Sequence, residues 1–211
     1  MKPAWFDPDC RACPRLAAFL EEVRADHPGY HARPVPPFGD PAARLLVVGL
    51  APGMHGANAT GRPFTGDHAG ILLYATLHET GFASAPVSAH AGDGLRLTGC
   101  RITNAVKCLP PQNRPTGAEI SNCNGFLQAE LRSLEEGSVV LALGSIAHRA
   151  VVSATGRRQV DHPFGHGKEH DLGAFRLLDS YHCSRYNTQT RRLTAEMFLA
   201  VFRRARDLLE P

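Results

Sequence analysis

The segment that most constrains the fold of this chain is a short apolar run that ends abruptly in a glycine-rich loop. Residues 45–50 read LLVVGL, and residues 51–70 continue as APGMHGANATGRPFTGDHAG. An unbroken apolar run of this length is typical of a strand buried on both faces, as in parallel sheets. Ligands of open α/β sheets bind where such strands end. We therefore expect a ligand site in the loop.

The same pattern of an apolar run followed by a polar cluster recurs along the chain. It is found at residues 101–106, 138–143 and 175–178. Helical periodicity or capping signals lie around these runs, at residues 10–27, 71–80, 119–134, 145–152 and 194–209. Strands that alternate with helices predict parallel βαβ units and an α/β fold. Because no linker-like composition divides the 211 residues, we expect a single domain over residues 1–211.

Charge and hydropathy exclude several classes of protein. The net charge of +3 is mild, so any contact with nucleic acid must come from local clusters of basic residues. No run approaches the roughly 20 apolar residues that span a bilayer, and the N-terminus lacks the apolar core of a signal peptide. We expect no membrane association and a cytoplasmic location, with association to the nucleoid. In that reducing compartment, cysteines indicate metal or thiol chemistry rather than disulfides.

Four of the six cysteines have the arrangement of a metal site. A C-x2-C pair opens the first helix, a second pair is separated by 14 residues, and the candidate ligands are Cys10, Cys13, Cys108 and Cys123. Four thiolates can hold a tetrahedral zinc ion or an iron-sulfur cluster, and spacing does not separate the two; unrelated buried cysteines are the alternative. We interpret Cys100 and Cys183 as packed thiols. Cys183 is a poor partner for His182, because adjacent strand residues point to opposite faces.

Several motifs together resemble the uracil-DNA glycosylase superfamily. They are GLAPG-x-HGAN-x-TGRPFTGD at residues 49–67, NAVKC-x-PPQN-x-PT at 104–116, YH-x-S at 181–184 and NTQT at 187–190. The chain is most similar to family 5, the iron-sulfur-containing B-type enzymes. The resemblance implies a three-layer α/β/α fold with a central four-stranded parallel sheet, and a [4Fe-4S] cluster on the four cysteines. It also implies a monomer that removes uracil, hypoxanthine or other deaminated bases from DNA and leaves an abasic site.

Three residues suit the chemistry that such an enzyme needs. Phe64 offers a face on which a flipped base can stack, although a core position is the alternative. Asp67 can activate water or stabilise the oxocarbenium-like sugar, and it matches the catalytic aspartate of the family; its alternative role is an N-cap for the helix that follows. His182 matches the histidine of the family and can stabilise the leaving base or a phosphate.

Further residues are candidates for reading the base and holding the DNA. Asn113 resembles the asparagine that bonds the base edge in family 5, and an amide both donates and accepts, whereas a turn residue is the alternative. We expect Gly53 and His55 to complete the pocket wall. Residues 180–195 contain three arginines and no acid, which predicts a DNA-binding loop or a merely solvated one. The candidate DNA contacts there are Ser184, Arg185, Asn187 and Arg191.

Three positions depart from the family 5 pattern. Ala59 stands where an arginine is usual, Cys183 where a proline is common, and Asn104 where a small residue is expected. An asparagine at the end of the second strand resembles family 4 and can supply a second amide for reading uracil. We therefore hypothesise a pocket that is narrower and more uracil-directed than the family 5 range.

A second class of function is an iron-sulfur protein that binds DNA or relays electrons without hydrolysis. Asp67 and His182 discriminate between the two classes, because a binding protein needs neither side chain. The enzyme is the preferred reading of these residues.

Overall fold

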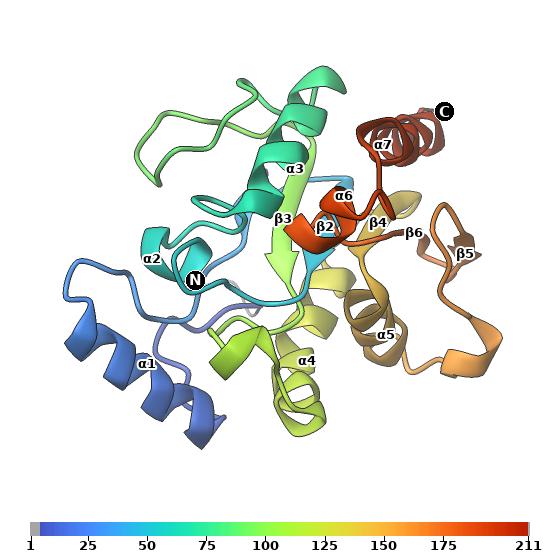
Figure 1. Ribbon diagram of the computed structural model, residues 1–211. Coiled ribbons are helices and arrows are strands. Elements are labelled where there is room, and N and C mark those ends of the chain that lie inside the picture. The colour runs from blue at the N-terminus through green and yellow to red at the C-terminus, as the bar shows by residue number, and fades with distance from the viewer. Residues whose placement is uncertain (1–4, 211) are drawn as a thin grey trace.

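The computed structural model describes residues 5–210 and places helices on both faces of a twisted sheet (Figure 1). The strand order is β1-β3-β2-β4-β6-β5. The central strands are parallel: β3 (Cys100–Asn104), β2 (Leu45–Gly49), β4 (Ser138–Leu143) and β6 (Phe175–Ser180). The four predicted parallel strands are confirmed.

Two short antiparallel strands at the edges of the sheet were not predicted. They are β1 (Phe38–Gly39), which pairs with β3, and β5 (Glu169–Asp171), which pairs with β6. Segments of two and three residues are too short to show a hydrophobic period, so the sequence pattern does not reveal them. The sheet is therefore mixed, with six strands rather than the expected four.

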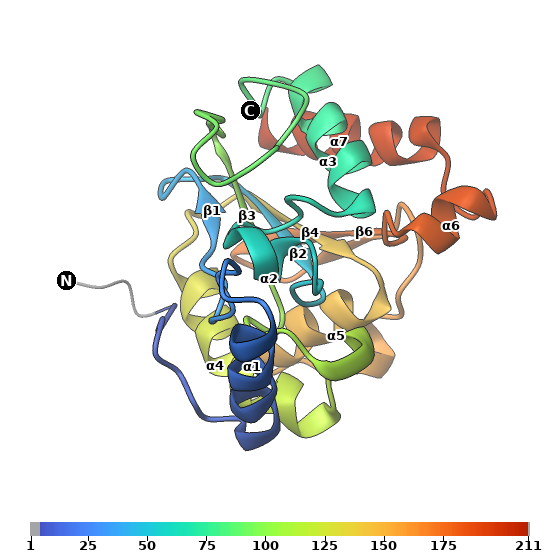
Figure 2. The same ribbon diagram turned by 60° about the vertical axis from the view of Figure 1, so that its left-hand side comes forward.

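The helices form the outer layers. Helices α3 (His68–Glu79) and α7 (Ala195–Leu209) cover one face, and α1 (Pro14–Asp26), α4 (Gly117–Arg132) and α5 (Ser145–Ala154) lie on the other side (Figure 2). Short helical segments complete the list: α2 (Ala57–Thr60), η1 (Pro111–Asn113), η2 (Gln159–Asp161) and α6 (Arg185–Gln189). Among residues 5–210, no helix has the length and apolar character needed to cross a membrane.

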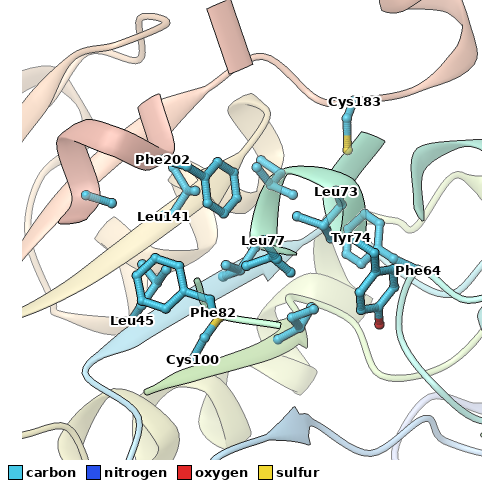
Figure 3. Packing of buried hydrophobic residues seen from close by; sticks show 14 of the residues in the cluster. Leu45, Phe64, Leu73, Tyr74, Leu77, Phe82, Cys100, Leu141, Cys183 and Phe202 are labelled. Carbon is cyan, nitrogen blue, oxygen red and sulfur yellow. The ribbon is translucent and has the colours of Figure 1, made fainter. Parts of the chain in front are cut away.

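The alternation of side chains in β2 divides the core between the two faces. Leu45 and Val47 pack with residues of α3 and α7 in the cluster of Figure 3, whereas Leu46 and Val48 pack with α4 and α5. All five residues of β2 are buried, as the apolar run predicted. The expected three-layer arrangement is thus present.

The parallel strands bring the loops that carry the predicted site residues to one edge of the sheet. The loops after β2, β3, β4 and β6 all leave from carboxyl ends of neighbouring strands. Asp67 begins α3 as its N-cap, and Thr116 begins α4 with a capping box. These caps determine where each loop stops, so they also position the side chains beside them.

Candidate functional site

A cavity of about 440 Å³ opens at the carboxyl ends of the parallel strands. Its walls come from the loop after β2, the start of α3, the end of β3, the turn η1 and the segment after β6. Predicted site residues form much of the lining, namely Gly53, Phe64, Asp67, Asn104, Asn113, His182, Ser184 and Arg185. The fold thus gathers in one place side chains that are far apart in the sequence.

Asp67 has two contacts that define its position. Its Oδ1 accepts a hydrogen bond from the backbone N–H of Gly70 at 2.9 Å, which caps α3. Its Oδ2 lies against Gly56, where an added Cβ would be only 2.8 Å away. Burial raises the pKa of the Asp67 carboxyl. One oxygen therefore holds the helix while the side chain lines the cavity, so the capping and catalytic interpretations are compatible.

Phe64 adopts a strained backbone conformation that places its ring in the pocket. Its φ is +54°, in the left-handed region that side-chain-bearing residues rarely occupy. Two glycines leave the room it needs: a Cβ at Gly49 would lie 2.6 Å from the ring, and one at Gly70 would lie 1.8 Å from the Phe64 carbonyl oxygen. Phe64 is buried in the core cluster and also lines the cavity, so it fills both roles considered from the sequence.

His182 faces Phe64 across the pocket. The two rings are stacked with their centroids 6.0 Å apart and their planes at 30°. Burial lowers the pKa of His182 to about 4, so the imidazole is neutral near pH 7. The Asn187 side-chain amide donates to the His182 carbonyl oxygen at 2.8 Å. Asn187 therefore positions the histidine, a role that was not predicted for it.

Asn104 contributes an unused polar atom. It lies at the carboxyl end of β3 and is 4% exposed. Its Oδ1 is buried and finds no hydrogen-bond partner among residues 5–210. A buried carbonyl oxygen without a partner costs about 1–3 kcal/mol. Because the side chain lines the cavity, a ligand with a suitably placed donor would recover that cost.

Asn113 approaches the same cavity from an unusual turn. Both Gln112 and Asn113 have φ of +55° inside η1. Asparagine tolerates this left-handed conformation better than most residues. Asn113 is exposed, so its amide is free to meet a ligand at the mouth of the cavity.

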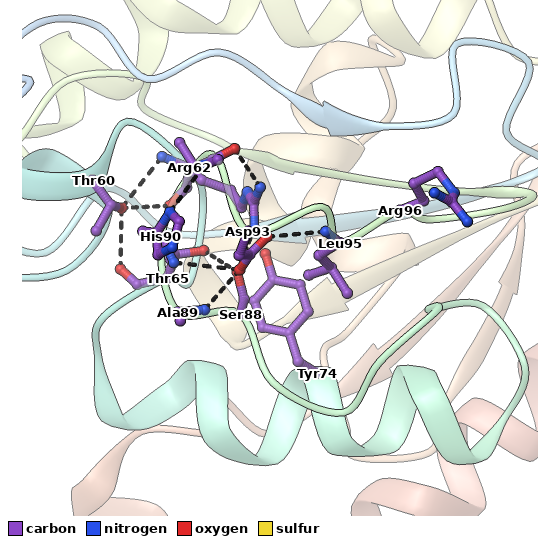
Figure 4. Close-up of polar contacts among 12 residues, drawn as sticks. Thr60, Arg62, Thr65, Tyr74, Ser88, Ala89, His90, Asp93, Leu95 and Arg96 are labelled. Atoms are coloured by element: carbon purple, nitrogen blue, oxygen red, sulfur yellow. Dashed lines mark hydrogen bonds and ion pairs between the residues drawn. The ribbon is translucent and has the colours of Figure 1, made fainter.

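A buried polar network supports the loop that carries Phe64 and Asp67 (Figure 4). Arg62 donates to Asp93 Oδ1 at 2.8 Å, to Ser88 Oγ at 2.9 Å and to the Ala91 carbonyl at 2.7 Å. Thr65 Oγ1 lies 2.7 Å from the same Ser88 hydroxyl. Arg62 and Thr65 are buried, although both are polar. No spacing rule links Arg62 to Asp93, so this anchor was missed.

Two predicted residues of the site lie elsewhere. His55 is not part of the cavity lining: its Nδ1 is 2.8 Å from the Tyr30 hydroxyl, and its ring meets Tyr30 edge-on. The prediction that His55 completes the pocket wall was wrong, because the loop turns this side chain toward the end of α1. Arg191 is exposed with φ of +56° and lies outside the lining.

The segment expected to be a DNA-binding loop begins with a short helix instead. Ser184 caps α6 by accepting from the Asn187 N–H at 3.4 Å. Sequence reasoning missed His68, which lines the cavity and contacts Thr188 of this helix through Nε2 at 3.1 Å. The serine, threonine and asparagine pattern from residue 184 onward is a capping signal that could have revealed α6.

The four candidate metal ligands surround one pocket of their own. Cys10, Cys13, Cys108 and Cys123 line it together with apolar residues of α1 and α4. The Lys107 backbone N–H donates to Cys123 Sγ at 3.3 Å, and the Asn122 amide contacts Cys13 Sγ at 3.7 Å. None of the four cysteines lines the cavity of Asp67. Such N–H donors stabilise thiolates that bind a metal centre.

The spacing of the four cysteine sulfurs indicates the size of the metal centre that they can bind. Zinc bonded to sulfur at about 2.3 Å in a tetrahedron sets thiolates about 3.8 Å apart. Within the described residues, the cysteines provide no set of three ligand atoms all within 4.8 Å of one another. The sulfurs are therefore spread more widely than around a single zinc ion. Cys100 and Cys183 are both buried in the main core, as expected for packed thiols.

Comparison with known proteins agrees with this geometry. The model of the uracil DNA glycosylase superfamily matches residues 36–206. This chain is a member of the uracil DNA glycosylase superfamily. Within it, the chain is 52% identical to the type-5 uracil-DNA glycosylase of Thermus thermophilus, over 94% of this chain and 93% of that protein. It is also 42% identical to the type-5 enzyme of Pyrobaculum aerophilum, over 95% and 92%.

Type-4 members of the superfamily match over a shorter region. The type-4 uracil-DNA glycosylase of Thermotoga maritima is 37% identical over 52% of this chain and 49% of its own length. The family 5 resemblance seen in the sequence motifs is thereby confirmed, and family 4 is the more distant relation.

Proposed function

We propose that this protein is a DNA repair glycosylase that hydrolyses the bond between uracil and deoxyribose and leaves an abasic site. The observation that carries this is one cavity lined by the carboxylate residue Asp67, the stacked rings of Phe64 and His182, and Asn104, whose Oδ1 has no hydrogen-bond partner among residues 5–210. The type-5 relatives are named for the same activity. Each of these groups answers a separate demand of the reaction.

The pocket has the donors and acceptors that uracil requires. Uracil presents an N3–H donor between two carbonyl acceptors. The buried Asn104 oxygen is an acceptor that has no donor among residues 5–210. Cytosine carries an acceptor at N3, so it would leave this oxygen unpaired. A site that depends on a hydrogen bond to its substrate strongly rejects analogues that lack the matching group. Phe64 supplies a stacking face for the flipped base.

Hydrolysis requires a water on one side of the sugar and charge stabilisation on the other. Asp67 orients a water and accepts its proton as oxygen bonds to the sugar carbon, and its negative charge stabilises the oxocarbenium-like sugar. The bond to the base breaks with its electron pair, so negative charge develops on the base. The neutral His182 donates an N–H to that charge without having to lose a proton first.

The range of bases follows from Asn104. Hypoxanthine offers the same pairing edge as uracil, an N–H beside a carbonyl, so a second amide alone does not reject it. Asn104 stands where a small residue is expected and narrows the pocket against the larger purine, so we propose a uracil-directed enzyme. Rates of excision from matched duplexes containing uracil or hypoxanthine test this. Comparable rates for the two bases would contradict the specificity but leave the glycosylase activity in place.

The DNA backbone is held by the segment after β6. Ser184 and Arg185 line the cavity, and Arg191 extends the basic surface beyond it. Tyr186 is 71% exposed beside them and offers an aromatic face to an opened duplex. We expect a monomer that acts at the nucleoid, since chromosomal DNA is the substrate.

The four cysteines fit a [4Fe-4S] cluster that joins α1 to the segment leading into α4. The spacing of their sulfurs supports a cluster over zinc, and the N–H donors to Cys13 and Cys123 support a metal centre on these thiolates. Such a cluster would act as a structural clasp, because its ligands do not line the cavity of Asp67. Iron and acid-labile sulfide, measured after anaerobic purification, should each approach four per chain; zinc in their place would overturn this assignment.

The decisive experiment uses a duplex oligonucleotide with one uracil. Incubation with the protein followed by hot alkali should cut the strand at that position, and the matching thymine duplex should stay intact. Strand integrity after prolonged incubation would refute the enzyme and favour an iron-sulfur protein that only binds DNA. Binding of the same duplex, measured in parallel, separates an inactive protein from one that does not meet its substrate.

A further inference from the structure

A buried polar cluster lies away from both the base cavity and the cysteine pocket. His148 on α5, His170 on β5 and Asp179 on β6 are 1%, 7% and 0% exposed. His148 Nδ1 lies 2.7 Å from Asp179 Oδ1, and His170 Nε2 lies 3.2 Å from Asp179 Oδ2. The potential ligand atoms of the three residues are all within 4.8 Å of one another. Neither the proposed reaction nor the cysteine clasp uses these side chains.

We propose that His148, His170 and Asp179 form a binding site for a divalent metal ion, with zinc as the ion that fits best. Two imidazole nitrogens and one carboxylate oxygen are a donor set that zinc accepts, and imidazole suits zinc well. Bonds of about 2.0–2.2 Å to such donors in a tetrahedron need ligand atoms about 3.3–3.6 Å apart. The separations of 2.7 and 3.2 Å, one to each Asp179 oxygen, are close to this spacing, and the ligand atoms of the three residues lie within 4.8 Å of one another.

The partners outside the triad orient its members for this role. His148 Nε2 lies 2.7 Å from the carbonyl oxygen of His162, and a carbonyl only accepts, so this nitrogen carries the proton. The lone pair of Nδ1 is then available to a metal. The Gly165 N–H donates to Asp179 Oδ2 at 3.2 Å. Metal-ligating histidines typically give their second N–H to a carbonyl in this way, and ligating carboxylates are themselves hydrogen-bonded.

A metal-free hydrogen-bonded cluster is the competing explanation. In that case a single proton lies between His148 Nδ1 and Asp179 Oδ1, and the two side chains form a hydrogen-bonded pair in the protein interior. Such buried pairs are often no better than apolar residues of similar volume. A divalent ion replaces the proton between His148 and Asp179 and binds His170 as well. A metal ion therefore gives His170 a role as a ligand, whereas a pair between His148 and Asp179 does not need it.

The position of the triad indicates a structural site. Its members lie on α5, β5 and β6 and link these elements. The segment between α5 and β5 passes close to the triad, and the ring of its His162 is 5.6 Å from that of His170. A water would complete a tetrahedron. Asp179 precedes His182 by three residues on the strand that enters the active site. Metal binding would thus stabilise the strand that delivers His182 without touching the substrate.

Metal analysis of the purified protein tests the proposal. Protein that carries its full complement of iron is dialysed against zinc and desalted. Analysis for both metals should then find one zinc ion per chain. Thermal unfolding with zinc at about 100 times its Kd should raise Tm by about 5–10 °C. The variant H148L/D179A removes the donors without leaving an unpaired charge, and it should lose both the zinc and the rise in Tm. H90Q, at an exposed histidine, is the matched control and should keep both.

Two results would overturn the proposal. One is an iron-loaded wild-type chain that retains no zinc, a result that does not depend on any variant. The other is equal zinc content in wild type and in folded H148L/D179A, which would place the ion elsewhere. If the double variant does not fold, H170Q replaces it, because its amide can still bond Asp179; zinc affinity should fall at least tenfold.

Discussion

The two walls of the base cavity differ in how firmly they are held. The wall from the loop after β2 rests on Arg62, which is 4% exposed and makes three hydrogen-bonded contacts. The opposite wall comes from Ser184 and Arg185, and the short helix that they begin continues past the exposed Tyr186 to a turn at Arg191, outside the lining. Among residues 5–210, neither Arg185 nor Arg191 forms a salt bridge. The first wall is therefore preorganised, and the arginines of the second segment are available to bind a negatively charged partner.

This difference matches the two tasks assigned to the walls. Activating a water needs a carboxylate held within a fraction of an ångström, which a buried and hydrogen-bonded loop provides. Gripping DNA needs positive side chains that adjust to a flexible backbone, and an exposed segment provides these. Substitutions in each wall test this difference. Those in the first wall should change stability or rate, and those in the second should change DNA binding.

The largest effect on rate is expected from Asp67→Asn. The variant should lose about 10²–10⁴-fold in single-turnover excision of uracil, because an amide cannot accept the proton of water. Its Tm should change little, since asparagine is an equally good N-cap for α3. Asp161→Asn, at an exposed carboxyl, is the control. A variant with full rate would show that Asp67 serves only as a cap.

The largest effect on stability is expected from Arg62→Met. The change leaves Asp93 and Ser88 without their buried partner, which should lower the free energy of unfolding by about 3 kcal/mol in denaturant titrations. Uracil excision should fall as well, because Phe64 and Asp67 lose their support. The matched change Arg191→Met in the other wall should leave stability within about 0.5 kcal/mol. Equal losses of stability would abolish the contrast between the walls.

A smaller effect on substrate recognition is expected from Phe64→Leu. Loss of a stacking contact worth about 1–3 kcal/mol should reduce kcat/KM by about 5–150-fold. Phe82→Leu changes a buried ring of the same core cluster that is not part of the cavity. It should destabilise the protein to a similar degree while kcat/KM stays within about twofold. A matching loss of activity in both variants would assign Phe64 to the core alone.

Weaker and salt-dependent effects are expected from Arg185→Gln and Arg191→Gln. Each should weaken DNA binding several-fold at low salt and reduce the slope of log K against log salt by about one, because each removes one phosphate contact. Tm should not change, in contrast to Arg62. Fluorescence anisotropy over a series of salt concentrations measures both quantities. An unchanged slope would remove the arginine in question from the DNA contact surface.

Two further effects depend on pH and separate Asp67 from His182. The raised pKa of Asp67 predicts that activity falls on acidification at a pH above the ordinary value of 3.8, because the carboxylate must be ionised. The lowered pKa of His182, about 4, means that the unfolded chain binds more protons between pH 6.5 and 4, so stability should fall as pH drops through that window. Thermal melts of wild type and His182→Gln from pH 4 to 7 test this; identical slopes would contradict it.

The sequence alone predicted the parallel strands, the main helices, the grouping of four cysteines at one site and most of the cavity lining. These features depend on local patterns: an apolar run, a capping residue or a motif that keeps its meaning wherever it lies. The strands β1 and β5 were missed because two or three residues carry no period. The helix α6 was missed because a basic composition obscured its serine cap.

Only the tertiary structure decided which distant side chains meet. Arg62 and Asp93 are 31 residues apart, and the His148 and Asp179 side chains are likewise 31 apart, yet each pair is in direct contact. His55 points to Tyr30 although its motif neighbours face the cavity. Such contacts depend on where whole elements pack, which no local pattern encodes. The sequence determined the chemistry available to this protein, and the packing of its layers decided which groups are held still, which stay free and which could share a metal ion.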